Sequence, residues 1–263
     1  MTMRIALGLE YCGTTFTGWQ SQPDGRGVQD ALEQALGVIA NAQVRTVAAG
    51  RTDTGVHATM QIVHFDVGAA RPDTAWVRGV NSNLPVDVGV LWARPVAGEF
   101  SARFDAVRRH YTYLLCARDV RPALSAGRVG WYHRSLDVAA MREAASVLVG
   151  THDFSAFRAA ECQAKSPTRT LWIAAITTTF DHVRFEFCAN AYLHHMIRNI
   201  VGALVYVGAG KHPPAWIGEL LAGRDRTRAA PTFAPDGLYS TGAEYDAKWQ
   251  LPPTRRAITL PVA

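Results

Sequence analysis

The chain has 263 residues, enough to bury a substantial core in one large or two small domains. Its 48% hydrophobic and 19% charged residues are ordinary for a folded protein and exclude a disordered chain. The net charge of +5 fits a nucleic-acid partner without requiring one. All but three of the 27 basic residues are arginines. This bias fits either GC-rich coding DNA or a need for the planar guanidinium fork in phosphate and base recognition.

The four cysteines are scattered, and none forms a CxxC pair, so neither a zinc knuckle nor a disulfide framework is indicated. The N-terminal apolar run is too short for a signal peptide. No run of about 20 apolar residues predicts a membrane-spanning helix. We therefore expect a soluble, cytoplasmic enzyme or binding protein without a membrane partner.

The first part of the chain switches between the periodicities of strands and helices. Ile5, Leu7 and Leu9 share one face of a predicted strand. A helical spacing of apolar residues follows, with Gln29 and Glu33 on the opposite side. In chain order, the sequence predicts a strand over 5–11, a helix over 28–39, strands over 44–49 and 61–67, a short helix over 73–82 and a strand over 86–96.

The second part repeats this order of elements. The sequence predicts a strand over 109–116, a helix from its N-cap Asp137 to Val149, strands over 170–178 and 183–189, helices over 192–207 and from Pro214, and a strand over 238–245. Strands that frame a helix in each half predict an α+β fold with a mostly antiparallel sheet and helices on one face. With no low-complexity linker, we expect an N-terminal half over 1–105 and a C-terminal half over 106–263.

Asp53 stands in GRTDTGVHA (residues 50–58), on a loop between two predicted strands, a usual place for chemistry. Asp, Thr and Gly favour turns, so Asp53 could simply bond its own backbone. Asp-Thr-Gly is also the tripeptide of aspartic proteases, which need two carboxylates sharing one proton. The chain has no second copy, and Arg51 would keep the carboxylate ionised. An ionised aspartate can instead act as a nucleophile or a base.

Arg198 lies in HHMIRN (residues 194–199), in the middle of the longest predicted helix. It is either a solvated helix arginine or part of a polar cluster with its neighbours. His194 and His195 are adjacent, so on a helix they would point about 100° apart and could not chelate one metal ion. We therefore expect no metal site.

Tyr111 lies in RRHYTYLL (residues 108–115) and shares a strand face with Tyr113. It is either a core tyrosine or a platform on which a base stacks, with Arg108 and Arg109 available for phosphate.

Several stretches together match one family in the family's own order. They are GWQSQ (18–22), GVQDALEQAL (27–36), GRTDTGVHA (50–58), IVHFD (62–66), NLP (83–85), SARFDAVRRHYTY (101–113), GTHDFSAFR (150–158), ANAYLHHMIRNIVGAL (189–204) and GLY (237–239). On these stretches the chain resembles the TruA family of tRNA pseudouridine synthases. Each motif alone is weak, but the set spans nearly the whole chain.

The resemblance implies a cofactor-free and metal-free homodimer of the pseudouridine synthase fold. Its subunits hold two related α/β-sandwich halves, ferredoxin-like in element order, that share a central sheet. The implied substrate is uridine at positions 38, 39 and 40 of the tRNA anticodon stem-loop. The departures are mild: Cys12, Met60 and Ser101 stand where aspartate, glycine and histidine are frequent.

The resemblance also assigns roles to single residues. The family's invariant aspartate falls on Asp53, its active-site tyrosine on Tyr111, and the arginine that pairs with the aspartate on Arg198. The arginine that assists base flipping falls on Arg51, and the apolar residue under the base on Leu238. Further expected substrate contacts are His57, Arg108 and Arg109.

Uracil must leave C1′ of its ribose, turn and rejoin through C5, and the nucleotide must first be flipped from its stack. Whether Asp53 attacks C6, attacks C1′ or abstracts a ribose proton stays open, as does the group that removes the C5 proton. A non-catalytic tRNA-binding protein or chaperone on the same fold is the alternative.

Overall fold

The computed structural model describes residues 2–68 and 71–258, which form two compact units. The first unit combines Met1–Arg109 with Tyr239–Ala263, and the second is His110–Leu238. The sequence places one boundary after residue 105 and leaves the C-terminal segment in the second half. In the structure that segment rejoins the first unit, because strand β10 (Leu238–Glu244) runs parallel to β3 (His57–Val67) and pairs with it.

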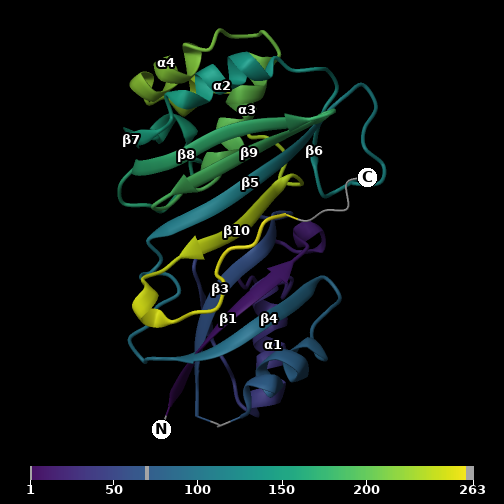
Figure 1. The fold of residues 1–263 in the computed structure, drawn as a ribbon, viewed down its shortest axis with the longest axis vertical. Helices are drawn as coiled ribbons and strands as arrows, with labels where there is room; N and C mark the ends of the chain where they lie inside the picture. Colours follow the sequence, from purple (N-terminus) through teal and green to yellow (C-terminus); the bar gives the residue numbers. More distant parts are fainter. Residues whose placement is uncertain (1, 69–70, 259–263) are drawn as a thin grey trace. The chain divides into compact units, whose positions relative to one another are not determined.

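The sheet of the first unit has the strand order β4-β1-β3-β10, with β2 also paired to β3 (Figure 1). Strand β1 pairs antiparallel with both β3 and β4, as β2 does with β3. The remaining bounds are β1 Met3–Tyr11, β2 Thr46–Ala48 and β4 Val88–Val96. The predicted strands over 5–11 and 86–96 are thus confirmed to within two or three residues.

Two helices cover one face of this sheet, α1 (Val28–Ala40) and the short π-helical turn η2 (Ala75–Gly79). Alternate residues of β1, among them Ile5 and Leu7, pack with Leu32 of α1 in one core cluster. This is the face predicted from their spacing. A smaller cluster on the other face joins Ile62, Phe100, Ala243 and Trp249.

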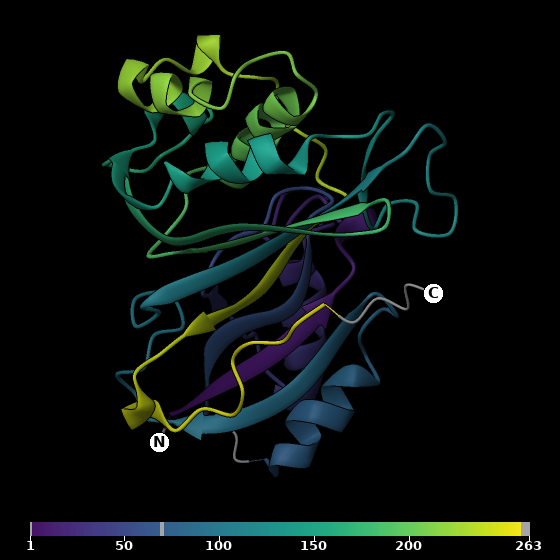
Figure 2. The same ribbon diagram turned by 45° about the horizontal axis from the view of Figure 1, so that its top comes forward.

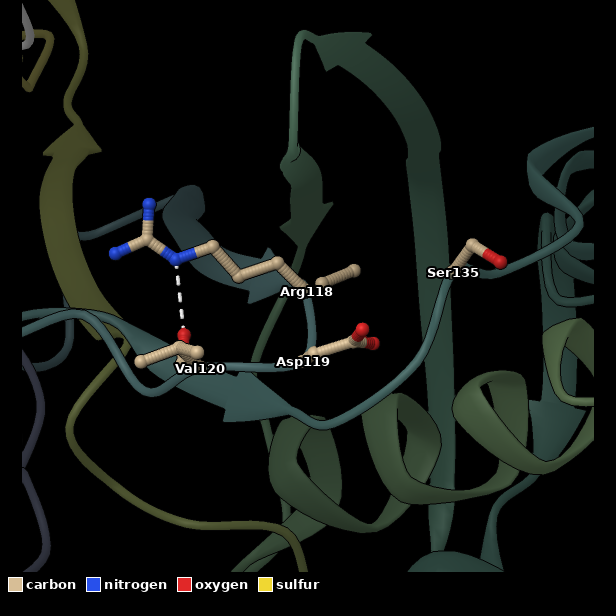
Figure 3. Close-up of a pocket in the computed structure, with 5 residues that line it drawn as sticks. Arg118, Asp119, Val120 and Ser135 are labelled. Carbon is tan, nitrogen blue, oxygen red and sulfur yellow. Dashed lines mark hydrogen bonds between the residues drawn. The ribbon is translucent and has the colours of Figure 1, made fainter.

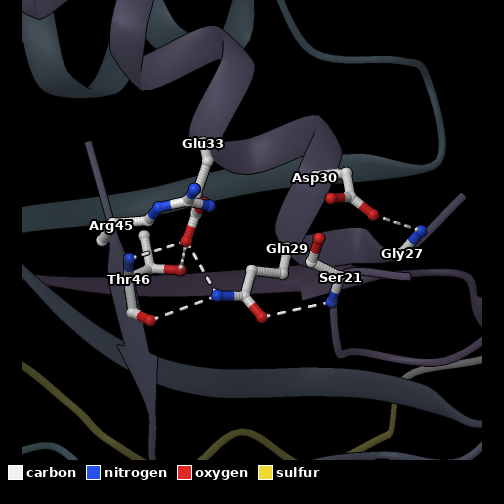
Figure 4. A network of polar contacts seen from close by, with 7 residues as sticks. All are labelled: Ser21, Gly27, Gln29, Asp30, Glu33, Arg45 and Thr46. Atoms are coloured by element: carbon white, nitrogen blue, oxygen red, sulfur yellow. Dashed lines mark hydrogen bonds and ion pairs between the residues drawn. The ribbon is translucent and has the colours of Figure 1, made fainter. Parts of the chain in front are cut away.

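Two polar residues of α1, Gln29 and Glu33, are partly buried in a hydrogen-bond network. The side chain of Glu33 is only 9% exposed. Its carboxylate accepts hydrogen bonds from the amide and the hydroxyl of Thr46 and from Gln29, and pairs with Arg45 at 2.9 Å (Figure 4). Gln29 in turn accepts from the Ser21 amide. These bonds tie the helix to the GWQSQ segment and to β2. Strand β2 precedes Asp53 in the chain, and the GWQSQ segment is hydrogen-bonded to Thr52 beside it.

The second unit has the strand order β5-β9-β8-β7, with β6 beside β5. Strands β7, β8 and β9 are antiparallel, and helices α2, α3 and α4 lie on one side of the sheet (Figure 2). The bounds are β5 Arg108–Ala117, β6 Gly130–Tyr132, α2 Val138–Ser146, β7 Gly150–Asp153, β8 Thr168–Thr179, β9 His182–Ala189, α3 Met196–Gly208 and α4 Trp216–Gly223. Short 3-10 turns are η1 Gly13–Thr15, η3 Ser155–Phe157, η4 Arg226–Arg228 and η5 Ala247–Trp249.

The predicted α+β class with mostly antiparallel strands is confirmed, although β6 and β7 were not predicted. Within residues 2–68 and 71–258, we find no helix with the length and apolar character that crossing a bilayer demands.

Buried His64 of β3 makes the stability of the first unit pH-dependent. Its Nδ1 accepts a hydrogen bond from the Ala102 amide at 3.1 Å. Burial, aided by the charge of Arg4, lowers the pKa of His64 below its usual value. The unfolded chain therefore takes up a proton near pH 6.5 that the folded chain resists, so stability is fully present above about pH 6.5 and falls below it.

We expect the urea midpoint to drop between about pH 7.5 and pH 5.5, and to drop less in His64→Gln, which keeps an acceptor but does not titrate. Equal drops in the two proteins would contradict this role of His64.

Candidate active site

Asp53 lies on the loop between β2 and β3, here called the aspartate loop (residues 50–56). Its side chain is half-buried. The Asp53 carbonyl accepts from the Val56 amide at 3.1 Å, and Gly55 has a φ of +79°. The backbone therefore turns immediately after Asp53, as the turn-forming residues predicted.

Strand β1 and the GWQSQ segment hold the loop from one side. The Trp19 amide donates to the Thr52 carbonyl at 3.0 Å, and the hydroxyls of Tyr11 and Thr52 lie 2.8 Å apart in a buried hydrogen bond. Gly18 has a φ of +103°, and a Cβ there would lie 2.9 Å from the Thr52 carbonyl oxygen. A glycine is thus required for this close approach to the residue preceding Asp53.

Strand β3 and Arg109 hold the start of the loop. The Gln61 amide group donates to the Gly50 carbonyl at 2.7 Å, and Arg109 Nε donates to the Ala49 carbonyl at 2.9 Å. With both sides fixed, the loop presents Asp53 on an ordered backbone, which is what catalysis by a positioned group needs.

The Tyr11–Thr52 hydrogen bond is expected to position Asp53. Tyr11→Phe and Thr52→Val each remove one hydroxyl with little change of shape. Each should lower kcat on the order of tenfold with less effect on KM. The double variant should be no worse than Tyr11→Phe, because that change already removes the bond to Thr52 as well as the 3.5 Å contact of the Tyr11 hydroxyl with Gln61 Nε2. Steady-state kinetics of the four proteins measure this coupling.

Tyr245→Phe is the matched control, since the Tyr245 hydroxyl donates to the Ala102 carbonyl in the same unit and not to the aspartate loop. Additive losses of the two single variants would show that the hydroxyls act separately.

Two predicted substrate contacts are built into this scaffold. Nδ1 of buried His57 accepts from the Gly13 amide at 3.0 Å, and its ring stacks on Tyr239 with centroids 4.6 Å apart. Arg109 donates to backbone carbonyls, among them those of Ala49 and Arg103. These contacts show that both side chains stabilise the fold around the aspartate loop. Their role in substrate binding stays a prediction.

Arg51 and Arg108 have exposed side chains in the first unit. Arg51 belongs to the aspartate loop, two residues from Asp53. Arg108 begins β5 and has one nitrogen 3.7 Å from Glu244. Both residues are exposed, and their contact with the substrate stays a prediction.

Both tyrosines of one strand face are buried in the second unit, Tyr111 at 9% exposure and Tyr113 at 0%. Tyr113 is fully buried, its hydroxyl donates to the Ala234 carbonyl at 2.9 Å, and burial raises its pKa above the usual value. It is a core residue. Tyr111 meets the edge of Tyr192 at 5.1 Å, which fixes the plane of its ring. A ring of fixed orientation suits the predicted stacking platform, and that role stays a prediction.

Arg198 lies in the first turn of α3, not in the middle of a helix, because α3 begins at Met196. Its Nε donates to the Phe233 carbonyl at 2.9 Å, and its own carbonyl accepts from the Phe233 amide. His194 and His195 precede the helix, and their ring centroids are 3.9 Å apart. The helical spacing used to separate these two rings therefore does not apply to them.

Asn199 is a structural residue that the sequence left within a polar cluster. It is fully buried, and its amide donates to the Phe157 carbonyl at 2.8 Å. Its Oδ1 accepts from the Thr232 hydroxyl at 2.7 Å and from Arg226 at 3.1 Å. These bonds join the start of α3 to the segment before β10 and so hold the backbone that carries Arg198. An asparagine among apolar helix positions was the available signal.

Leu238 is the first residue of β10, and its amide donates to the Pro235 carbonyl at 2.8 Å. The preceding Gly237 packs so closely that a Cβ would lie 2.2 Å from the Leu114 carbonyl oxygen. Gly237 of the GLY motif thus permits the close backbone packing that fixes the position of Leu238 at the start of β10.

A cluster of possible metal ligands lies in the second unit, where Cys116, Asp181 and His182 have ligand atoms within 4.8 Å of one another. Asp181 is already bound by Arg118 at 3.1 Å and by His182 Nδ1 at 2.7 Å. Burial raises the pKa of the Cys116 thiol, which disfavours the thiolate that a metal ion would need. We interpret this cluster as an ion-pair network.

An open hollow adjoins this network (Figure 3). Arg118 Nε donates there to the Val120 carbonyl at 2.9 Å. The lining residues are Ala117, Arg118, Asp119, Val120 and Ser135. None of these five belongs to the predicted site, so the hollow adds nothing to it.

Comparison with known proteins decides the family. A family model described as tRNA pseudouridine synthase matches residues 9–105 and 144–246. The chain belongs to this family. The tRNA pseudouridine synthase A of Methylobacillus flagellatus is 58% identical over 99% of this chain and 100% of its own length. Those of Thiobacillus denitrificans and Chromobacterium violaceum are 60% and 61% identical, each over 95% of this chain and 96% of their own.

Most candidate site residues of this tRNA pseudouridine synthase family member lie within the two stretches that the family model matches. The first contains Arg51, Asp53 and His57, and the second contains Arg198 and Leu238. Tyr111 lies between the two stretches. The resemblance inferred from the sequence motifs is confirmed, whereas the role of each site residue stays a prediction.

Proposed function

We propose that this protein isomerises uridine to pseudouridine in tRNA, with Asp53 as its reacting carboxylate. The observation that carries the proposal is a half-buried aspartate on an anchored loop, in a chain that belongs to the tRNA pseudouridine synthase family. An aspartic protease is not supported: the chain belongs to the tRNA pseudouridine synthase family, and with a single Asp-Thr-Gly a protease would need a second copy of the chain to complete its pair of carboxylates.

The reaction is redox-neutral. The bond between N1 and C1′ breaks, a bond between C5 and C1′ forms, C5 loses a proton and N1 gains one. An ionised carboxylate can attack C6 or C1′, or take a ribose proton, and each role needs Asp53 charged. We propose that Arg198 pairs with the Asp53 carboxylate and orients it, that Tyr111 stacks on the flipped uracil, and that Leu238 provides an apolar wall. Arg51 would fill the space that the base leaves.

We further propose uridines 38, 39 and 40 of the anticodon stem-loop as the sites of modification, a homodimer as the working form, and the cytoplasm as the location. Support comes from the resemblance and from the arginine-rich composition, which suits phosphate contacts. No metal or cofactor is required by a redox-neutral rearrangement that begins from a carboxylate.

Tritium release tests the proposal, because isomerisation frees the hydrogen at C5. The purified protein should release tritium from tRNA transcribed with [5-³H]uridine. Binding of tRNA without any release would favour the non-catalytic tRNA-binding protein or chaperone instead.

A further inference from the structure

An exposed aromatic ring stands on residues 101–107 of the first unit, here called the Phe104 loop. Phe104 is 83% exposed, and the guanidinium carbon of Arg103 lies 5.6 Å from its ring centroid. Single exposed apolar residues are common and need no explanation. The backbone and the charges around Phe104 distinguish it from such residues.

The backbone of the Phe104 loop is fixed from within. The Ser101 amide donates to the Asp105 carboxylate at 2.7 Å, and the Asp105 amide donates back to the Ser101 carbonyl at 3.0 Å. The Phe104 amide donates to the Ser101 hydroxyl at 3.2 Å. A ring on such a loop can bind a partner with little loss of backbone entropy.

The same loop is joined to the aspartate loop through Arg109. Two guanidinium nitrogens donate to the carbonyls of Arg103 and Ala106, while Nε donates to that of Ala49. Ala49 directly precedes the aspartate loop. The exposed ring and Asp53 are therefore held by one side chain within one unit, so a molecule that binds Phe104 is placed relative to Asp53.

The charges at the loop favour a polyanion. Arg103 and Arg108 are exposed. Of the neighbouring carboxylates, that of Asp105 is bound to the Ser101 amide, and that of Glu244 pairs with Arg108 at 3.7 Å and with Arg255 at 3.2 Å. An aromatic face beside guanidinium groups is the arrangement that binds unpaired bases between phosphates.

We propose that Phe104 stacks on an unpaired base of the RNA substrate, with Arg103 at a neighbouring phosphate. This proposal rests on the proposed function for the identity of the RNA. It assigns the Phe104 loop to binding and not to the chemical step, because stacking outside the reacting nucleotide stabilises ground and transition states alike.

Binding of labelled tRNA transcript to three variants tests the proposal. Phe104→Ala and Phe104→Leu should both raise Kd about tenfold, since neither residue has a π-face, whereas Phe104→Trp should stay within about twofold of the wild type. At saturating tRNA, kcat should change less than Kd does in Phe104→Ala and Phe104→Leu.

Phe180 is the matched control. It is 96% exposed, but it lies at the turn between β8 and β9 with Asp181 next to it. Phe180→Ala should bind tRNA like the wild type. If Phe104→Ala also binds like the wild type, the proposal is wrong, and if Phe104→Leu retains full affinity, stacking is wrong. A weaker Kd accompanied by a change of oligomeric state on size exclusion would point to a contact between copies of the chain.

Failure of the proposed function would look different. The wild type would then bind tRNA without releasing tritium, and the Kd values of the Phe104 variants would still decide whether the ring stacks on RNA.

Discussion

Asp53→Asn is expected to abolish isomerisation while leaving the fold and tRNA binding in place. Asparagine keeps the size of the side chain but removes the negative charge that attack or proton abstraction needs, so kcat should fall at least about a thousandfold. The loop should keep its form, because hydrogen bonds to Thr52, Gly50 and Ala49 anchor it. Tritium release and a tRNA binding assay measure the two effects separately.

Asp66→Asn is the matched control in the same unit. Asp66 lies on β3 and pairs with Arg4 at 2.7 Å, which lowers the pKa of its carboxyl. Its loss should affect stability slightly and turnover little, because it is an exposed pair. Comparable losses of kcat in the two variants would mean that any removed carboxylate in this unit disturbs the enzyme.

Gly13→Ala is expected to destabilise the first unit and to disturb the aspartate loop. A Cβ at Gly13 would lie 2.0 Å from the carbonyl oxygen of Val56, the last residue of the aspartate loop. Backbone must move to relieve that overlap, and the Gly13 amide donates to His57 Nδ1, so the loop and β3 move together. The free energy of unfolding should fall on the order of 3 kcal/mol, and kcat should fall even where the protein stays folded. Urea denaturation and kinetics check both.

Gly98→Ala provides the comparison, because a Cβ there meets nothing within 4 Å and the residue has no left-handed φ. It should leave the unfolding free energy nearly unchanged. If Gly13→Ala were as stable and active as Gly98→Ala, the backbone around Val56 would have to move aside at little cost, and the prediction would be wrong.

Most of the fold could be predicted from hydrophobic periodicity, because a strand such as β1 or a helix such as α1 is long enough to show its period. β6 and β7 are three and four residues long, too short for any period to appear. The return of the C-terminal segment to the first unit depends on the pairing of Tyr239 with His57, a long-range contact that local sequence does not report.

The candidate site likewise has features that local sequence predicts and features that depend on long-range contacts. The loop position of Asp53 and the exposure of Arg51 follow from local turn chemistry. The framework contacts of His57, Arg109 and Glu33 do not, since a hydrogen-bonding side chain finds its partner only in the tertiary structure. The start of α3 was also misplaced, because the residues before Met196 continue its apolar pattern without being helical.

Mapping pseudouridine by carbodiimide treatment and reverse transcription, on an unmodified tRNA transcript incubated with the purified protein, tests the central claim most directly. The account predicts stops at uridines of the anticodon stem-loop after incubation with the wild type, and none after incubation with Asp53→Asn that binds the same tRNA. Stops of equal strength with Asp53→Asn would contradict it. So would the absence of stops on every tRNA when the wild type is folded and binds tRNA.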